Sequence, residues 1–142
     1  MKNDQFEVIA RAIILKDNKI LICQSRGHAW WFFPGGHVEF GEKTEKALER
    51  ELKEETGSEI KNIAFIGAVE NHFKQNDQIH HEFNLVFEAE LEDQNIDSQE
   101  DHLEFQWLDL DLVPEAKIYP VALKEAFLKW VKDKKIFWAS QF

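Results

Sequence analysis

Three glutamates near the middle of the chain, Glu51, Glu54 and Glu55, have the spacing i, i+3 and i+4. On a helix this spacing makes the three carboxylates neighbours. Neighbouring like charges repel one another and partial burial opposes ionisation, so the arrangement needs a compensating cation. Carboxylate oxygens suit Mg²⁺, for which Mn²⁺ can substitute, and both ions leave positions open to phosphate oxygens. The triplet therefore predicts a divalent-metal site, and an ordinary solvated helix rich in Glu and Lys is the alternative.

A helix over residues 44–56 is expected to carry the triplet. Thr44 suits the N-cap, Glu45 the first turn, and Gly57 the left-handed position that ends many helices. The two faces of this helix differ. The polar face carries Lys46, Glu49 and Lys53, and the apolar face carries Ala47, Leu48 and Leu52. The triplet lies beside the apolar face, and Arg50 stands four residues before Glu54, close enough to hold its carboxylate.

Strands are expected on both sides of this helix. Polar residues 16–19 separate two β-branched runs, a pattern typical of a hairpin. The aromatic run 30–33 predicts a short strand that enters a Pro-Gly-Gly loop. A second helix is expected to begin near Pro120, which suits a first turn, with Leu123, Ala126, Phe127 and Trp130 at helical spacing. The two runs of the hairpin cover residues 6–15 and 20–23, and further strands are expected over residues 63–69, 82–89 and 103–108.

Composition and order of elements indicate one globular domain over residues 1–142. The fold class is α/β (α+β), with a central mixed sheet covered by helices. With 17 basic and 27 acidic residues the formal charge is −10, which repels long nucleic acids and anionic lipids. A small phosphorylated ligand can bind only where metal ions or a cationic pocket reverse the local sign.

Two further features of the sequence exclude classes of protein. Cys23 is the only cysteine, so an intrachain disulfide and a multi-cysteine zinc site are excluded, and its apolar surroundings predict a buried side chain. The first residues lack a signal-peptide apolar stretch, and no run approaches the roughly 18 apolar residues of a membrane span. A cytoplasmic protein without membrane association is expected.

Residues 36–58 resemble the Nudix box, whose pattern is G-x5-E-x7-R-E-U-x-E-E-x-G-U with U a bulky apolar residue. The matching positions are Gly36, Glu42, Arg50, Glu51, Leu52, Glu54, Glu55 and Gly57. Ser58 replaces the last apolar residue, which is expected to cost some packing at the next strand without changing the charges. The remaining elements are consistent with a Nudix-type α/β/α sandwich over nearly the whole chain.

The resemblance implies a Mg²⁺-dependent hydrolase of a phosphoanhydride bond in a nucleoside diphosphate derivative or a nucleoside triphosphate. The implied metal ligands are Glu51, Glu54 and Glu55 with a carbonyl of Gly35 or Gly36. Arg50 would orient the glutamates, and Glu42 would join their network and relay a proton. Family members often use a further acid downstream of the box as a ligand or general base. The candidates are Glu100, Asp101 and Glu104, with Glu100 favoured.

Several alternatives stay open. A non-catalytic Nudix-like module that senses a nucleotide or ADP-ribose would be expected to have lost box acids, yet every charged box position is present. A protein-binding domain with a vestigial site is a third reading. Oxidised or ordinary nucleoside triphosphates, ADP-ribose, nucleotide sugars and dinucleoside polyphosphates all fit as small-molecule substrates. Exposed aromatic residues could form a homodimer surface or simply belong to the core.

Aromatic residues and histidines outside the box are candidates for contacts to a base or a phosphate. Within 30–33, successive side chains should alternate in direction, so one of each neighbouring pair could face a nucleobase while the other joins the core. Core packing is favoured for most of the four. His80 and His81 should likewise point to opposite faces of a strand. Structural roles are favoured for both histidines and for His72.

Overall fold

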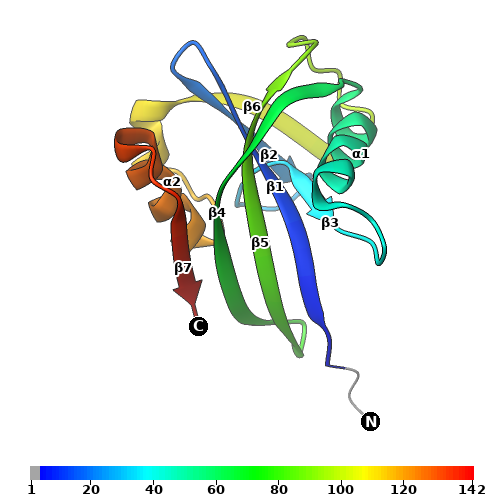
Figure 1. The fold of residues 1–142 in the computed structure, drawn as a ribbon, viewed down its shortest axis with the longest axis vertical. Helices are drawn as coiled ribbons and strands as arrows, with labels where there is room; N and C mark the ends of the chain where they lie inside the picture. The colour runs from blue at the N-terminus through cyan, green and yellow to red at the C-terminus, as the bar shows by residue number, and fades with distance from the viewer. Residues whose placement is uncertain (1–3) are drawn as a thin grey trace.

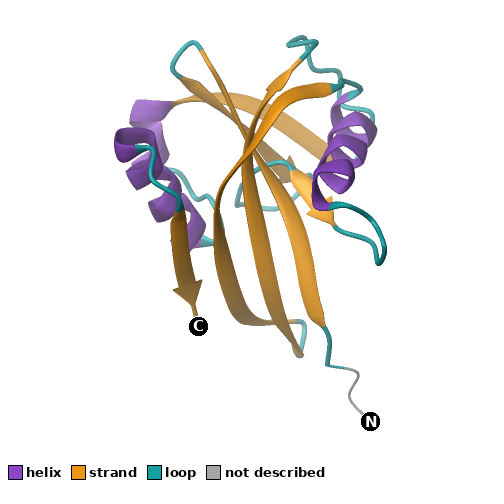
Figure 2. Ribbon diagram, in the orientation of Figure 1, coloured by secondary structure: helices purple, strands orange, loops and turns teal. Residues whose placement is uncertain are grey.

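The computed structural model describes residues 4–142. Within this part of the chain, two α-helices lie on either side of a long, twisted sheet (Figures 1 and 2). The strands are β1 (Phe6–Lys16), β2 (Lys19–Ser25), β3 (Gly35–His37), β4 (Ile60–Gln75), β5 (Gln78–Leu91), β6 (Leu103–Asp109) and β7 (Phe137–Gln141). The helices are α1 (Thr44–Thr56), α2 (Val121–Asp133) and the 3-10 helix η1 (Leu110–Glu115). None of the described helices is long and apolar enough to cross a membrane.

The sheet is mixed, as the sequence predicted. Its strand order is β6-β2-β1-β5-β4-β7, with β3 paired to β1 outside this path. The pairs β1–β5 and β4–β7 are parallel, whereas β1–β2, β1–β3, β2–β6 and β4–β5 are antiparallel. The expected first hairpin is confirmed, with Asp17 and Asn18 both at positive φ in its turn.

Two apolar cores lie on the two faces of the sheet. Because successive strand residues point to opposite faces, Ile13 of β1 packs toward Phe127 and Trp130 of α2, while Ile14 packs toward Leu48 of α1. The α1 core also includes Leu52 and Ala12, and the α2 core includes Phe33. Cys23 is fully buried, as predicted, and burial raises the pKa of its thiol to about 12.

The predicted bounds of α1 are confirmed, although its first residue was assigned the wrong role. Gly57 has φ 79°, and its N–H donates to the Lys53 carbonyl at 2.9 Å, closing the last turn. Thr44 is inside the helix, and the N-cap is Lys43, which makes no side-chain capping bond. Pro120 is likewise the N-cap of α2 rather than a residue of its first turn.

The aromatic run 30–33 is not the strand that the sequence predicted. Trp31 and Phe32 form only isolated bridges, to Ile118 and Cys23 respectively. The short strand instead begins at Gly35, within the predicted loop, because a residue without a side chain can lie directly against the carbonyl of Ala10 on β1. The strands β4 and β5 extend beyond their predicted ends, and β7 and η1 were not predicted.

Candidate metal and substrate site

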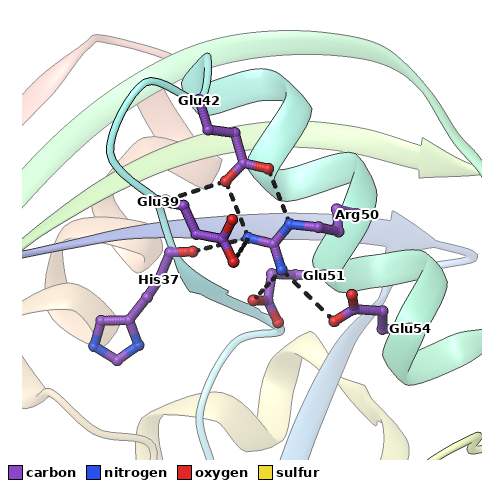
Figure 3. A network of polar contacts seen from close by, with 6 residues as sticks. All are labelled: His37, Glu39, Glu42, Arg50, Glu51 and Glu54. Atoms are coloured by element: carbon purple, nitrogen blue, oxygen red, sulfur yellow. Dashed lines mark hydrogen bonds and ion pairs between the residues drawn. The ribbon is translucent and has the colours of Figure 1, made fainter.

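Arg50 lies at the centre of a network that joins the loop before α1 to the helix (Figure 3). Its guanidinium donates twice to Glu42, from Nε at 2.9 Å and from Nη2 at 3.0 Å. It also donates from Nη1 to Glu51 at 2.9 Å and from Nη2 to the His37 carbonyl at 3.1 Å. Glu54 is farther away, with 3.6 Å between Arg50 Nη1 and Glu54 Oε2. Arg50 therefore holds Glu42 and Glu51 more closely than Glu54, the partner expected from spacing.

The charges in this network stabilise one another. The hydrogen bond from Arg50 is the main reason that the pKa of Glu42 lies below its ordinary value. The same bond to Glu42 raises the pKa of Arg50, with burial opposing and Glu51 adding to the rise. Arg50 is thus a permanent cation, and Glu42 stays ionised beside it.

Glu55 is the buried member of the triplet. It is 7% exposed, and its Oε2 atom has no hydrogen-bond partner within the described chain. Burial, and then the charge of Glu51, raise the pKa of Glu55 to about 8. The charge of Arg11 opposes this rise and that of Glu100 adds to it. A buried carboxylate oxygen without a partner is unfavourable, so this atom is suited to bind a cation.

The Glu51 carboxylate lies directly against the backbone of Gly36. A Cβ atom added at Gly36 would overlap the carboxylate carbon and oxygens of Glu51. Gly36 is held there by pairing with Ala10 across β3 and β1. The absence of a side chain at Gly36 therefore brings a backbone strand and an acidic side chain of the helix into contact.

The predicted convergence of three carboxylates is only partly observed. Glu51 and Glu55 are close, whereas the Glu54 side chain is 52% exposed and lies beside Arg50. Among residues 4–142, no group of three or more His, Cys, Asp or Glu side chains is gathered closely enough to hold a metal ion. Repulsion among the carboxylates favours this spread. Arg50 pairs with Glu51 and Glu54, which keeps Glu54 on the Arg50 side of the helix.

The oxygen donors nevertheless fit a hard divalent cation. Glu51 and Glu55 contribute carboxylates, Glu55 has an unpaired oxygen, and Gly36 lies in contact with Glu51. Mg²⁺ prefers carboxylates and carbonyls with several waters, so two adjacent carboxylates beside a backbone strand provide suitable ligands.

Of the three downstream acids, Glu100 is the one whose charge affects a member of the triplet, Glu55. The Gln99 N–H donates to the Glu55 carbonyl at 2.9 Å and docks this loop on the end of α1. The charge of Glu100 consequently acts on the pKa of Glu55. Asp101 is exposed in a turn, and Glu104 on β6 pairs with Arg26 at 3.5 Å.

Ser58, which stands where the box pattern has an apolar residue, is buried and hydrogen-bonded. It is 4% exposed. Its hydroxyl donates to the Glu59 carbonyl at 2.8 Å and accepts from the Asp93 N–H at 3.0 Å. Because the hydroxyl has partners both as a donor and as an acceptor, its burial costs little stability.

The alternation predicted for residues 30–33 is confirmed even though they form no strand. Trp30 and Phe32 line a cavity, while Trp31 and Phe33 pack in the α2 core. His80 and His81 point to opposite faces as predicted, where their ring nitrogens contact Glu7 and Glu70 respectively.

The same cavity contains residues that the sequence reading missed. It measures about 440 Å³, and its lining includes Arg11, Asn71, Glu82 and Tyr119. Arg11 donates to Asn84 at 3.1 Å and to the Phe33 carbonyl at 3.0 Å. The sequence signal that could have identified Arg11 is its charge inside the apolar run of β1, because a charged residue buried there requires polar partners.

Comparisons with known proteins agree with this arrangement. A family model described as NUDIX domain matches residues 6–131. The ADP-ribose pyrophosphatase of Methanocaldococcus jannaschii is 29% identical over 126 residues, which are 87% of this chain and 73% of that protein. The NAD-capped RNA hydrolase NudC of Pseudomonas aeruginosa is 34% identical over 109 residues, 72% of this chain but 36% of that protein. The solved structure of a MutT protein from Bacillus halodurans shares the fold, with TM-score 0.78 and 21% identity, covering 96% of this chain and 90% of that chain.

Proposed function

The chain belongs to the NUDIX family of hydrolases, and from this premise we propose that it is a Mg²⁺-dependent pyrophosphohydrolase of nucleotide derivatives. Mn²⁺ would substitute for Mg²⁺. The proposed reaction cleaves a phosphoanhydride bond in a nucleoside diphosphate linked to another group, or in a nucleoside triphosphate. Cytoplasmic residence and a homodimer stay predictions.

The observation that carries this proposal is the Glu51–Glu55 pair on α1. Glu55 has a buried oxygen without a partner, and Glu51 lies against Gly36. Two adjacent carboxylates, one of them buried, are a poor arrangement for stability alone. A bound cation would offset their repulsion, and the acidic chain could then accept a substrate that is itself anionic.

We assign the roles as follows. Glu51, Glu54, Glu55 and the Gly36 carbonyl would hold the metal, which when bound neutralises phosphate charge and lowers the pKa of a coordinated water. Arg50 would keep Glu51 oriented through its hydrogen bond and hold Glu54 near the site through their ion pair.

Two further acids would complete the site. Glu42 would fix the Arg50 guanidinium by two hydrogen bonds, which use both carboxylate oxygens and keep Glu42 ionised, so we propose a positioning role for it instead of the implied proton relay. Glu100 would accept the proton of the water that attacks phosphorus, for which its location beside Glu55 is suitable.

The substrate class rests on the chemistry of the site and on the names of the relatives. Their names, ADP-ribose pyrophosphatase and NAD-capped RNA hydrolase, both denote hydrolysis of a nucleotide derivative. The charge of −10 disfavours a long nucleic acid for this chain. We therefore propose a small nucleotide as substrate, with ADP-ribose, nucleotide sugars and nucleoside triphosphates as the compounds to test.

The decisive experiment is a hydrolysis panel of these compounds with Mg²⁺, with Mn²⁺ and with a chelator. Metal-dependent release of a nucleoside monophosphate from at least one compound is expected, and Glu55→Gln should lower that rate by about 100-fold or more. Glu49→Gln, on the polar face of the same helix, is the matched control. Tight nucleotide binding without product over hours would instead identify a sensor module and contradict the proposal.

A further inference from the structure

The cavity of about 440 Å³ lies on the sheet face that α2 covers, beside the candidate metal site. Arg11 connects the two regions. It pairs with Gly35 across β1 and β3, one position from Gly36, and it also lines the cavity. The charges of Glu82, Glu55 and Glu51 all act on the pKa of Arg11, which burial lowers. A group attached to a diphosphate at the glutamates could therefore extend past Arg11 into the cavity.

Asn71 lines this cavity and carries an unsatisfied acceptor. It is 7% exposed, and its Oδ1 atom has no hydrogen-bond partner within the described chain. Buried side-chain oxygens almost always have a donor, so an unpaired one that lines a cavity indicates a donor on a ligand. A bound group with an N–H directed at β4 would satisfy it.

Glu82 supplies a second acceptor at the same level of the sheet. Asn71 and Glu82 are cross-strand partners on β4 and β5, and both line the cavity. Such partners have Cβ atoms about 4.5–5.5 Å apart on one face. The nearby Arg11 directs its bonds to Asn84 and the Phe33 carbonyl rather than to Glu82. Two acceptors therefore stand side by side.

Aromatic rings provide flat walls around these acceptors. Trp30 and Tyr119 are stacked, with ring centroids 6.2 Å apart and planes at 21°, and Phe32 and Phe73 also line the cavity. Flat apolar walls with a few polar groups at one end suit a planar heterocycle with a hydrogen-bonding edge.

We propose that this cavity holds the base of the substrate and that Asn71 and Glu82 select a base with two adjacent N–H donors, as guanine has. Guanine presents a ring N–H next to an exocyclic amine, which matches two acceptors. Adenine and cytosine place a ring acceptor beside their amine, and uracil has one N–H between two carbonyls. The inference rests on the proposed function, since it assigns the base of the same nucleotide substrate.

Equilibrium binding of GMP and IMP, with Mg²⁺ present, tests the proposal without requiring turnover. Both nucleotides have the ring N–H, and they differ only in the exocyclic amine, which would donate to one of the two acceptors. We expect GMP to bind at least about tenfold more tightly than IMP by isothermal titration calorimetry, and AMP to bind more weakly than GMP. Equal affinities for the three nucleotides would overturn the proposal.

Two variants assign the preference to the named residues. Glu82→Gln replaces a pure acceptor by an amide and should remove most of the difference between GMP and IMP. Asn71→Leu should reduce the difference in affinity between GMP and IMP. If this buried variant does not fold, Glu82→Gln still tests the assignment. The matched control is Glu88→Gln on the same strand outside the cavity, which should keep the preference. A preference that survives Glu82→Gln unchanged would refute the assignment.

The outcome is separable from that of the hydrolysis panel. A GMP preference without hydrolysis of any compound would support the base assignment while contradicting the enzyme. Hydrolysis without discrimination between guanine and hypoxanthine compounds would support the enzyme and contradict the base assignment.

Discussion

Arg50 and Glu42 form a two-point ion pair between the middle of α1 and the loop that precedes it, with N–O distances of 2.9 and 3.0 Å. The two side chains are 28% and 18% exposed, so the pair is screened less than a surface pair. The same guanidinium reaches Glu51 and the His37 carbonyl. One planar group thus fixes the loop, the helix and a proposed metal ligand relative to one another.

Replacing the Arg50 guanidinium by an ammonium group should weaken the connection between the loop, the helix and Glu51. In Arg50→Lys a single nitrogen cannot keep both bonds to Glu42 together with those to Glu51 and His37. Turnover and Mg²⁺ affinity are expected to fall by about 10- to 100-fold while the protein stays folded. Mg²⁺ titrations of the hydrolysis rate measure this. The control is Arg26→Lys, whose exposed pair with Glu104 at 3.5 Å should tolerate the change. Equal Mg²⁺ titrations for both variants would show that Arg50 orients nothing.

A methyl group at Gly36 should displace a proposed metal ligand. The added Cβ of Gly36→Ala would overlap the Glu51 carboxylate, so that carboxylate must move away from β3. The expected result is a smaller rise in melting temperature on adding Mg²⁺, because the metal would bind the altered site less tightly. Gly27→Ala is the comparison, since nothing lies within 4 Å of its added Cβ, although its positive φ adds backbone strain. An unchanged Mg²⁺ response in Gly36→Ala would argue against Glu51 as a ligand.

Burial of Glu55 should make the metal-free protein less stable as pH rises. Its pKa is raised from 4.5 to about 8, so between these values the folded state holds a proton that the unfolded state has lost. Stability therefore decreases across this pH window, by about 5 kcal/mol at most. Urea unfolding in a chelator from pH 5 to 9 measures the slope.

The variant Glu55→Gln isolates this contribution because its amide does not titrate. It should be the more stable protein at pH 8 in chelator and should show a flatter pH dependence than the parent. Mg²⁺ should restore stability to the parent more strongly at pH 8 than at pH 5.5, since the metal binds the ionised carboxylate. Parallel curves for the two proteins would mean that Glu55 ionises normally.

Local features of the sequence were sufficient to predict α1. Its apolar residues recur at helical spacing, and Gly57 ends it with a conformation that glycine adopts readily, so both signals lie within the segment itself. The box glutamates could be placed for the same reason. The N-cap was misplaced at Thr44 because the observed cap, Lys43, makes no side-chain bond that a residue type would reveal.

Features that depend on distant partners could not be predicted. The strand β7 forms because residues 137–141 pair in parallel with β4, and five residues carry too little local preference to show this. Arg11 was visible as a charge in an apolar run, but Asn84, which accepts its hydrogen bond, lies 73 residues away. Asn71 and Glu82 meet only through the long β4–β5 hairpin, so their shared cavity was also invisible.

The choice among the downstream acids gives the last prediction. Glu100 acts electrostatically on Glu55, and its loop is docked on α1 through the Gln99 N–H. Each acid has a partner at 3.5 Å, His102 for Glu100 and Arg26 for Glu104, so the two differ in their placement relative to Glu55. Glu100→Gln removes the proposed proton acceptor and should lower kcat by about 100-fold or more with little change in KM. Glu104→Gln makes the same chemical change on a residue only four positions later and should retain activity. Steady-state kinetics over pH 6–9 decide between them, because loss of a general base also removes its limb of the pH–rate profile. If Glu104→Gln were the impaired variant, the loop would have to rearrange when substrate binds, and Glu100 would lose its assigned role.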